Sequence, residues 1–163
     1  MEQSFEDQLA SLLPRLRRFA HALSRNSADA DDLTQATIER ALKARGQWQP
    51  GARLDSWTYR IMRNLWIDTA RSRSRRNAHE APEEEGLNVG DDPRGAMDAS
   101  VDLHRLTAAM GRLPDEQREV VALILVEGFG YREVAEMLGL PIGTVSSRLV
   151  RGRTALLAMV GER

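Results

Sequence analysis

Cysteine is absent from this chain of 163 residues, and aromatic residues make up only 5% of it. Without cysteine there can be no disulfide framework and no thiolate metal site, which agrees with a reducing compartment. The three histidines, His21, His79 and His104, are too scattered along the sequence to indicate a metal cluster. We therefore expect neither a metal nor any other cofactor.

Long apolar runs are also missing. The longest, residues 120–126, is far shorter than the roughly 20 residues that a membrane-spanning helix needs. The first residues include acids and no basic stretch of the kind that opens a secretory signal. We expect a cytoplasmic protein that does not insert into a membrane. The sequence shows no nucleophile–base pair and no phosphate-binding loop, so an enzyme is the least favoured class.

Charge is plentiful, and its sign changes along the chain. Residues 1–76 hold 14 basic and 9 acidic residues, residues 77–101 hold 1 and 7, and residues 102–163 hold 8 and 8. The middle segment combines prolines and glycines with few large apolar residues, a composition that cannot fold alone. We predict two small domains, 1–76 and 102–163, joined by a flexible acidic linker, 77–101. Alternatively, the acidic segment is a short ordered mimic of nucleic acid that lies in a basic groove.

Every patterned segment has helical spacing, so we predict an all-α fold. In the first segment apolar residues recur at steps of three and four, which indicates an amphipathic helix. They are Phe5, Leu9, Leu12, Leu13, Leu16, Phe19 and Leu23. Pro14 must either start the main part of this helix or bend it.

A second helical pattern covers residues 29–44 and begins with acids, which helix N-termini favour. The positions predicted to face inward are Leu33, Ile38, Ala41 and Leu42. The other face carries Asp32, Gln35 and Glu39, an acidic and polar strip that could dock a basic partner. From the pattern alone, the solvated side of a helix is the favoured interpretation.

A third helical pattern, residues 54–76, begins at the helix-initiating pair Asp55–Ser56. The predicted inward row is Trp57, Ile61 and Leu65, with Tyr59, Met62 and Trp66 beside it, and the segment closes with Arg71, Arg73, Arg75 and Arg76. Aromatic side chains beside a basic run suit a surface that stacks unpaired bases and neutralises their backbone. The simpler interpretation is that the tryptophans are core residues and the arginines a solvated helix end.

Residues 131–158 carry the spacing of a helix-turn-helix. Val134, Ala135 and Leu138 lie on one side of a first helix. Gly139 can take the positive φ that ends it, and Pro141 opens the next helix. The second helix buries Val145, Leu149 and Leu156 and turns outward Thr144, Ser147, Arg148 and Arg151. Hydroxyls and arginines without a neighbouring acid suit the major groove of DNA. The alternative is a plain helical hairpin whose arginines are only solvated.

Three segments, in this order, resemble the extracytoplasmic-function (ECF) sigma factors of the sigma-70 family. Residues 29–42 look like the part of region 2 that binds the clamp helices of RNA polymerase, and residues 54–76 like the part that recognises and melts the −10 element. Residues 113–156 look like region 4. The resemblance implies a transcription initiation factor with a region 2 helical bundle and a region 4 helix-turn-helix, each of which holds polymerase and promoter.

The resemblance also implies roles for individual residues. The polymerase-facing surface would be Asp32, Gln35 and Glu39. The −10 element would meet Arg60, Arg63, Asn64, Asp68, Arg71 and Arg73, with Asn64 near the pocket for a flipped base. The −35 element would meet Thr144, Ser146, Ser147, Arg148, Val150, Arg151 and Arg153, with Arg151 the best candidate for a guanine contact. The implied partners are core RNA polymerase, through its clamp helices and flap, promoter DNA and an anti-sigma factor.

Some positions depart from the usual family pattern. Ser146 stands where a basic residue is common and Val150 where an aromatic residue or histidine is frequent, so a base preference cannot be inherited. Gly152 replaces the usual alanine, and helix propensity predicts that it weakens the helix by about 0.8–1 kcal/mol. Asp68 is acidic beside DNA and could act by rejecting a base.

Two other classes compete with this interpretation. A dimeric helix-turn-helix regulator would leave the second basic and aromatic segment unexplained, and no zipper or ligand pocket is evident. A sigma-like decoy that titrates an anti-sigma factor would be expected to lose its DNA-contacting residues, yet Arg148, Arg151 and the arginines of residues 71–76 are present.

Overall fold

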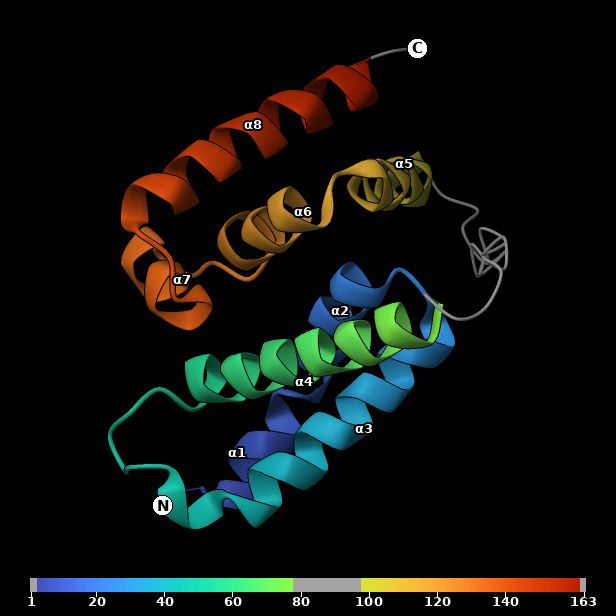
Figure 1. Ribbon diagram of the computed structural model, residues 1–163. Helices are drawn as coiled ribbons and strands as arrows, with labels where there is room; N and C mark the ends of the chain where they lie inside the picture. Colours follow the sequence, from blue (N-terminus) through green and yellow to red (C-terminus); the bar gives the residue numbers. More distant parts are fainter. Residues whose placement is uncertain (1–2, 78–97, 162–163) are drawn as a thin grey trace. The chain divides into compact units, whose positions relative to one another are not determined.

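The computed structural model describes residues 3–77 and 98–161, which belong to two compact units within residues 1–89 and 90–163 (Figure 1). Every regular element in the described ranges is helical, which confirms the predicted all-α class. The predicted acidic linker, 77–101, lies mostly outside the described residues. Within the described ranges, no helix is long and apolar enough to cross a membrane, and no group of acidic residues and histidines could hold a metal ion.

The N-terminal segment forms two helices rather than one. Helix α1 (Phe5–Ser11) is capped by Ser4, whose hydroxyl accepts a hydrogen bond of 3.1 Å from the backbone N–H of Asp7. Helix α2 (Leu13–Ser24) begins two residues after α1 ends and carries Pro14 in its first turn. A proline is tolerated there because the first N–H groups of a helix have no intrahelical partner. Pro14 thus starts the main helix instead of bending it.

A sharp corner leads into the rest of the first unit. Arg25 adopts a left-handed φ of 57°, and the side chain of Asn26 caps α3 (Ser27–Lys43) by accepting a bond of 3.0 Å from the N–H of Asp29. The short 3₁₀ helix η1 (Arg45–Gln47) and a loop then lead to α4 (Leu54–Asn77). Helices α2, α3 and α4 pack on one another in every pairing (Figure 1).

The core of the first unit lies among these three helices. Phe19 of α2 and Tyr59 of α4 meet edge to face with their ring centroids 5.1 Å apart, a favourable aromatic geometry. Three threonines are buried as well, and each hydroxyl donates to the backbone carbonyl four residues earlier: Thr34, Thr37 and Thr58. Their polar groups are therefore satisfied within their own helices.

The inward faces of α3 and α4 differ from the predicted ones. Leu42 is 38% exposed, whereas Thr34 and Thr37 occupy the buried stripe. On α4 the predicted row of Trp57, Ile61 and Leu65 is only half-buried, and the fully buried side chains are Thr58, Tyr59 and Met62. The apolar pattern identified the buried Leu33 and Ala41, and it placed Tyr59 and Met62 beside the inward row. It missed the buried threonines because they carry no apolar signal.

The second unit begins with α5 (Asp98–Arg112), α6 (Asp115–Val121) and the π-helical turn η2 (Ala122–Val126). Arg118 of α6 is only 2% exposed, although arginine is rarely buried. Its guanidinium donates a hydrogen bond of 2.7 Å to the backbone oxygen of Leu113 and forms an ion pair with Asp115. Arg118 therefore ties the end of α5 to the start of α6.

Helices α7 (Tyr131–Leu138) and α8 (Ile142–Gly161) form the predicted helix-turn-helix. Gly139 adopts a φ of 65°, a conformation that glycine takes without strain, and ends α7. The N–H of Leu140 then donates to the carbonyl of Ala135 at 3.0 Å. Of the side chains predicted to be inward, Ala135 is only half-buried and the others are buried, namely Val134, Leu138, Val145, Leu149 and Leu156.

One prediction about α8 needs correction. Helix propensity alone predicts that Gly152 weakens this helix relative to alanine. Gly152 is buried, however, and a Cβ atom there would lie 2.7 Å from Cγ2 of Val121 in α6. Alanine does not fit without movement, so the comparison of propensities does not describe this position.

Candidate nucleic-acid interface

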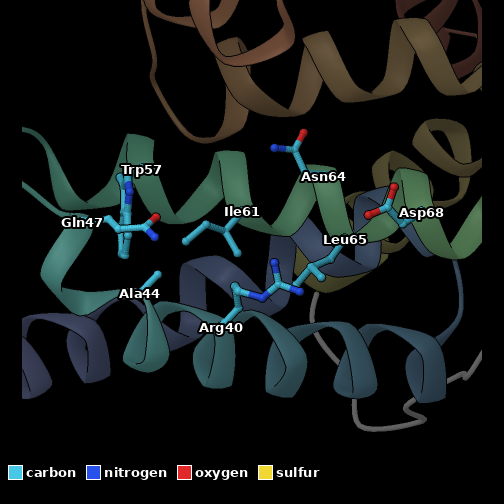
Figure 2. A pocket seen from close by; sticks show the side chains of 8 residues that line it. All are labelled: Arg40, Ala44, Gln47, Trp57, Ile61, Asn64, Leu65 and Asp68. Atoms are coloured by element: carbon cyan, nitrogen blue, oxygen red, sulfur yellow. The ribbon is translucent and has the colours of Figure 1, made fainter.

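A shallow pocket of about 150 Å³ lies between α3 and α4 of the first unit. Its lining residues are Arg40, Ala44, Gln47, Trp57, Ile61, Asn64, Leu65 and Asp68. Figure 2 shows Trp57, Ile61 and Leu65 on the side of α4 that faces α3, with Arg40 reaching toward them from α3. Asn64 also belongs to the lining, but its amide extends from the side of α4 away from α3, and Asp68 lies one turn further along α4. The pocket thus combines an apolar floor with two amides and two opposite charges.

Aromatic side chains support one end of this pocket. The ring of Phe5 in α1 lies 5.6 Å from that of Trp48 and 6.2 Å from that of Trp57, measured between centroids. The guanidinium of Arg45 lies 5.4 Å from the centroid of Phe5 and forms an ion pair with Glu6. These contacts connect α1 to η1 and to the start of α4. They therefore hold Trp57, which lines the pocket, in place.

All the residues predicted for the −10 element lie on α4, but they differ in exposure. Arg60, Asn64, Asp68 and Arg71 are exposed, whereas Arg63 and Arg73 are half-buried. Asn64 and Asp68 line the pocket. Trp66 is half-buried beneath Arg73, whose guanidinium carbon lies 5.8 Å from the ring centroid. Trp57 and Trp66 thus make contacts within the chain, but both are half-buried and neither is a core residue as the simpler interpretation expects.

Arg73 is held by an acid from another helix. Its two terminal nitrogens donate to the two carboxylate oxygens of Asp29 in α3, at 2.8 and 2.7 Å. Such bidentate pairs are the strong and geometrically specific kind of ion pair. The hydrogen bond from Arg73, and then its charge, lower the pKa of Asp29 against a smaller opposing effect of burial. The last turns of α4 are therefore fastened to the first turn of α3.

A second acid orders the first turn of α4. Asp55 accepts hydrogen bonds from Arg53, at 3.1 and 2.9 Å, and from the backbone N–H of Ser56 at 2.8 Å. Arg15 of α2 lies 3.3 Å away. Burial raises the pKa of Asp55, but these hydrogen bonds and positive charges outweigh it and lower the pKa overall.

The acidic strip on α3 is exposed along its whole length. Asp32, Gln35 and Glu39 are all exposed, and the amide of Gln35 donates to Glu39 at 3.3 Å. This bond arranges two of the three side chains along one face of the helix.

The outer face of α8 is exposed and carries an internal hydrogen-bond pair. The guanidinium of Arg151 donates to the backbone oxygen of Ser147 at 3.3 Å and to its hydroxyl at 3.1 Å. The other exposed side chains of the predicted set are Ser146, Val150 and Arg153, whereas Thr144 is half-buried. Arg148 is turned toward α6, where it lies 3.7 Å from Glu116. The structure thus places Arg151 and Ser147 at the centre of the exposed face and Arg148 at its border.

Sequence reasoning missed several residues of these surfaces. Arg40 and Gln47 line the pocket, and Phe5 and Trp48 support it, yet none of the four was predicted. The Trp48–Trp57 spacing spans a loop, so helical periodicity cannot relate the two rings. The nearest signal was the presence of two tryptophans around a short loop rich in glycine and proline.

Family models match both units of the chain. Sigma-70 region 2 matches residues 9–76, and Sigma-70, region 4 matches residues 103–156. These matches include α3 and α4 in the first case and the helix-turn-helix in the second.

Relatives match over nearly the whole chain. The ECF RNA polymerase sigma factor EcfG of Rhodopseudomonas palustris is 35% identical over 98% of this chain and 87% of its own length. The RNA polymerase sigma factor CarQ of Myxococcus xanthus is 32% identical over 99% of this chain and 91% of its own length. The sigma factor RpoE of Bartonella quintana, solved in complex with the anti-sigma factor NepR, superposes with a TM-score of 0.85 at 31% identity and 98% coverage of both chains. The chain therefore belongs to the ECF sigma factors of the sigma-70 family.

Proposed function

We propose that this chain, a transcription initiation factor by family, uses three separate surfaces: the α3 strip for core RNA polymerase, the α4 pocket for the −10 element and the outer face of α8 for the −35 element. The pocket is the observation that supports the proposal most, because α4 contributes both to its lining, including Asn64, and to the exposed arginines. In this proposal residues 1–76 form the domain that binds polymerase and the −10 element, and residues 102–163 form the domain that binds the −35 element.

The pocket has the size and chemistry to take one unpaired base. A cavity of about 150 Å³ can enclose a single six-membered aromatic ring. Trp57, Ile61 and Leu65 offer an apolar floor against a base face, and the amide of Asn64 can both donate to and accept from a base edge. Capture of a flipped base in this way offsets the cost of unstacking, which is a few kcal/mol. We assign promoter melting to this pocket.

We assign to the arginines of α4 the neutralisation of the phosphate backbone of the −10 DNA. Arg60 and Arg71 are exposed near the pocket, and Arg63 and Arg73 are half-buried beside them. Asp68 lies at the rim of the pocket, where a negative charge would disfavour some base edges. This arrangement supports selection among bases by repulsion as well as by attraction.

The outer face of α8 has the chemistry of a major-groove reading surface. Arg151 presents a planar guanidinium that Ser147 already orders, so less side-chain entropy is lost when it binds. We assign the guanine contact to Arg151 and the surrounding base or phosphate contacts to Thr144, Ser146, Ser147, Arg148, Val150 and Arg153. Arg148 would reach a phosphate from the border of the face.

Two protein partners complete the proposal. The exposed acidic strip of Asp32, Gln35 and Glu39 is assigned to the clamp helices of core polymerase, and the second unit to the flap. An anti-sigma factor is proposed as a further partner because the similar sigma factor of Bartonella quintana was solved with one. Exposed apolar side chains of the second unit suit such a partner, with Leu103 at 62% and Leu157 at 61% exposure.

Run-off transcription tests the proposal. Core RNA polymerase is combined with the chain on fragments of the region upstream of its own gene, and permanganate reactivity of thymines reports melting. Specific transcripts should start only when the chain is present. Asn64→Ala should abolish melting, Arg151→Ala should weaken binding of the −35 element by about 1–3 kcal/mol, and both variants should still bind core polymerase.

Matched variants serve as controls. Gln8→Ala removes an amide of α1, and Arg105→Ala removes an exposed arginine of α5, so both should transcribe like the unmodified chain. If the chain neither binds nor redirects core polymerase but shifts a DNA fragment as a dimer, the proposal is wrong and a dimeric regulator replaces it. If it binds an anti-sigma factor but neither polymerase nor DNA, it is a decoy.

A further inference from the structure

Helix α8 contacts α6 through a glycine. A Cβ atom built on Gly152 would lie 2.7 Å from Cγ2 of Val121, 3.3 Å from Cβ of Gln117 and 3.5 Å from the backbone oxygen of Gln117. Carbon atoms in ordinary contact are about 3.5–4.0 Å apart, so a side chain at this position requires a displacement of roughly 1 Å. The missing side chain is what lets the two helices approach this closely.

The atoms that face Gly152 cannot yield easily. Val121 is 1% exposed and lies in a helix, where a β-branched side chain has one strongly preferred rotamer. Gln117 presents its Cβ and its backbone oxygen, neither of which can rotate away. Close-packed interiors transmit such a displacement instead of absorbing it. A larger residue at 152 would therefore move α8 as a body.

The exposed face of α8 would move with it. Gly152 stands between Arg151 and Arg153, which are both exposed, and one turn after Arg148, which reaches Glu116 of α6. Arg151 donates a hydrogen bond to Ser147 within α8, so both side chains move together when the helix moves. Hydrogen bonds weaken steeply when distance and angle depart from their optimum, so a shift of the helix disturbs every base contact of this face.

We propose that Gly152 is a positioning residue for recognition of the −35 element: its missing side chain seats α8 against α6 and sets the depth and angle at which Arg151 and Ser147 enter the major groove. The inference rests on the proposed function of α8.

The chain supplies its own matched control. Gly143 lies in the same helix, and a Cβ there would meet nothing within 4 Å. Gly152→Ala and Gly143→Ala are therefore the same chemical change and differ in what the new methyl group meets. The double variant Gly152→Ala with Val121→Ala removes Cγ2 of Val121, the atom that a Cβ at 152 would meet most closely, and leaves only the longer contacts with Gln117. Val121→Ala alone completes the cycle.

The experiment measures how much the −35 element contributes to binding. Each full-length variant is combined with core polymerase, and its affinity is measured for a promoter fragment with the −35 element and for one with that element scrambled. Circular dichroism at the assay temperature establishes that each variant is folded. The ratio of the two affinities should fall roughly tenfold or more in Gly152→Ala, because base contacts of α8 carry that ratio. It should stay unchanged in Gly143→Ala and be largely restored in the double variant.

The outcomes separate this inference from the proposed function. If the unmodified chain itself has no preference for the −35 element, the role proposed for α8 is wrong. If the unmodified chain has that preference and folded Gly152→Ala keeps it, the positioning inference alone is overturned. If Gly152→Ala does not fold, the double variant decides, since a folded double variant that lacks the preference also overturns the inference.

Discussion

Helices α4 and α8 both present arginines to a proposed DNA surface, but they hold them in different ways. On α4, Arg73 is fixed by Asp29 from α3 and lies over Trp66. On α8, Arg151 is bonded to Ser147 of its own helix. The α4 surface is thus ordered by tertiary contacts, whereas the α8 surface is ordered locally and depends on how the whole helix is seated.

This difference indicates where each surface is vulnerable. Removal of a support beneath α8 should disturb all its contacts together, because they move with the helix. Each support of the α4 surface should instead have its own, separate effect: loss of a charge or of an aromatic contact should disturb only the part of α4 that it holds. The following predictions test that contrast, from the largest expected effect to the smallest.

Arg118→Ala should destabilise the second unit most. The substitution removes a buried side chain and leaves the oxygen of Leu113 without its guanidinium donor, which together should cost about 3 kcal/mol in the free energy of unfolding. Since α6 supports α8, the preference for the −35 element should be lost as the unit unfolds. Urea denaturation followed by circular dichroism measures the effect. Arg105→Ala, at an exposed position of α5, should change stability by less than about 0.5 kcal/mol, and equal effects of the two would contradict the role of Arg118.

Phe5→Ala should loosen the pocket of the first unit. The ring contacts Trp48 and Trp57, and their loss should cost about 1–2 kcal/mol of stability. Tryptophan fluorescence should shift because two of the three tryptophans lose a neighbour. Promoter melting should weaken while binding of the −35 element is retained, and an unchanged fluorescence spectrum would show that α1 does not support the pocket. Gln3→Ala, at an exposed position just before α1, is the control.

Acid should weaken the fastening of α4 to α3. Because the ion pair with Arg73 holds the pKa of Asp29 below its ordinary value in the folded chain, it contributes stability above the unfolded pKa. That contribution is lost as pH falls through the folded pKa. Asp29→Asn should therefore lower the thermal unfolding midpoint near neutral pH and flatten its decline in acid. The pair is partly exposed, so the loss should be at most about 1 kcal/mol. Asp55, whose pKa is also lowered, should leave some acid sensitivity in the variant. A variant as acid-sensitive as the unmodified chain would rule out the assigned role of Asp29.

Ser147→Ala should have the smallest effect. It removes the hydroxyl that orders Arg151 but leaves the backbone oxygen that also accepts from it. Affinity for the −35 element should fall by about 0.5 kcal/mol, less than in Arg151→Ala. Binding assays with both variants on one fragment measure the ranking. A Ser147→Ala effect as large as that of Arg151→Ala would mean that a direct contact of Ser147 with DNA outweighs its ordering of Arg151.

The helices and their order were largely predictable from the sequence. The turn at Gly139, the start of α2 near Pro14 and the inward leucines and valines of α8 depend on local backbone chemistry and helical period, which a sequence displays directly. The buried stripes of α3 and α4 were less predictable because Thr37 and Thr58 satisfy their hydroxyls within the helix. A polar residue type does not reveal that its polar group is already paired.

The candidate site was predictable only in part. The sequence pointed to Asn64 and Arg151 through motif and resemblance, and the structure places them at the edge of the pocket and on the exposed face of α8. It could not show the contact of Gly152 with Val121, which joins α8 to α6 across the intervening elements η2 and α7. Nor could it show that Phe5 reaches Trp48 and Trp57. Contacts between residues distant in sequence depend on packing and have no periodic signature.

The bundle in which α2, α3 and α4 pack on one another also affects how the chain folds during its synthesis. Each of these helices packs against its nearest or next-nearest neighbour in sequence, which gives a low contact order. Helical bundles of this kind fold in microseconds to milliseconds. Synthesis of residues 78–163 takes several seconds at about 5–20 residues per second, and these helices are complete by Asn77. The first unit can therefore finish folding during translation, before Gly152, where α8 packs on α6, has left the ribosome.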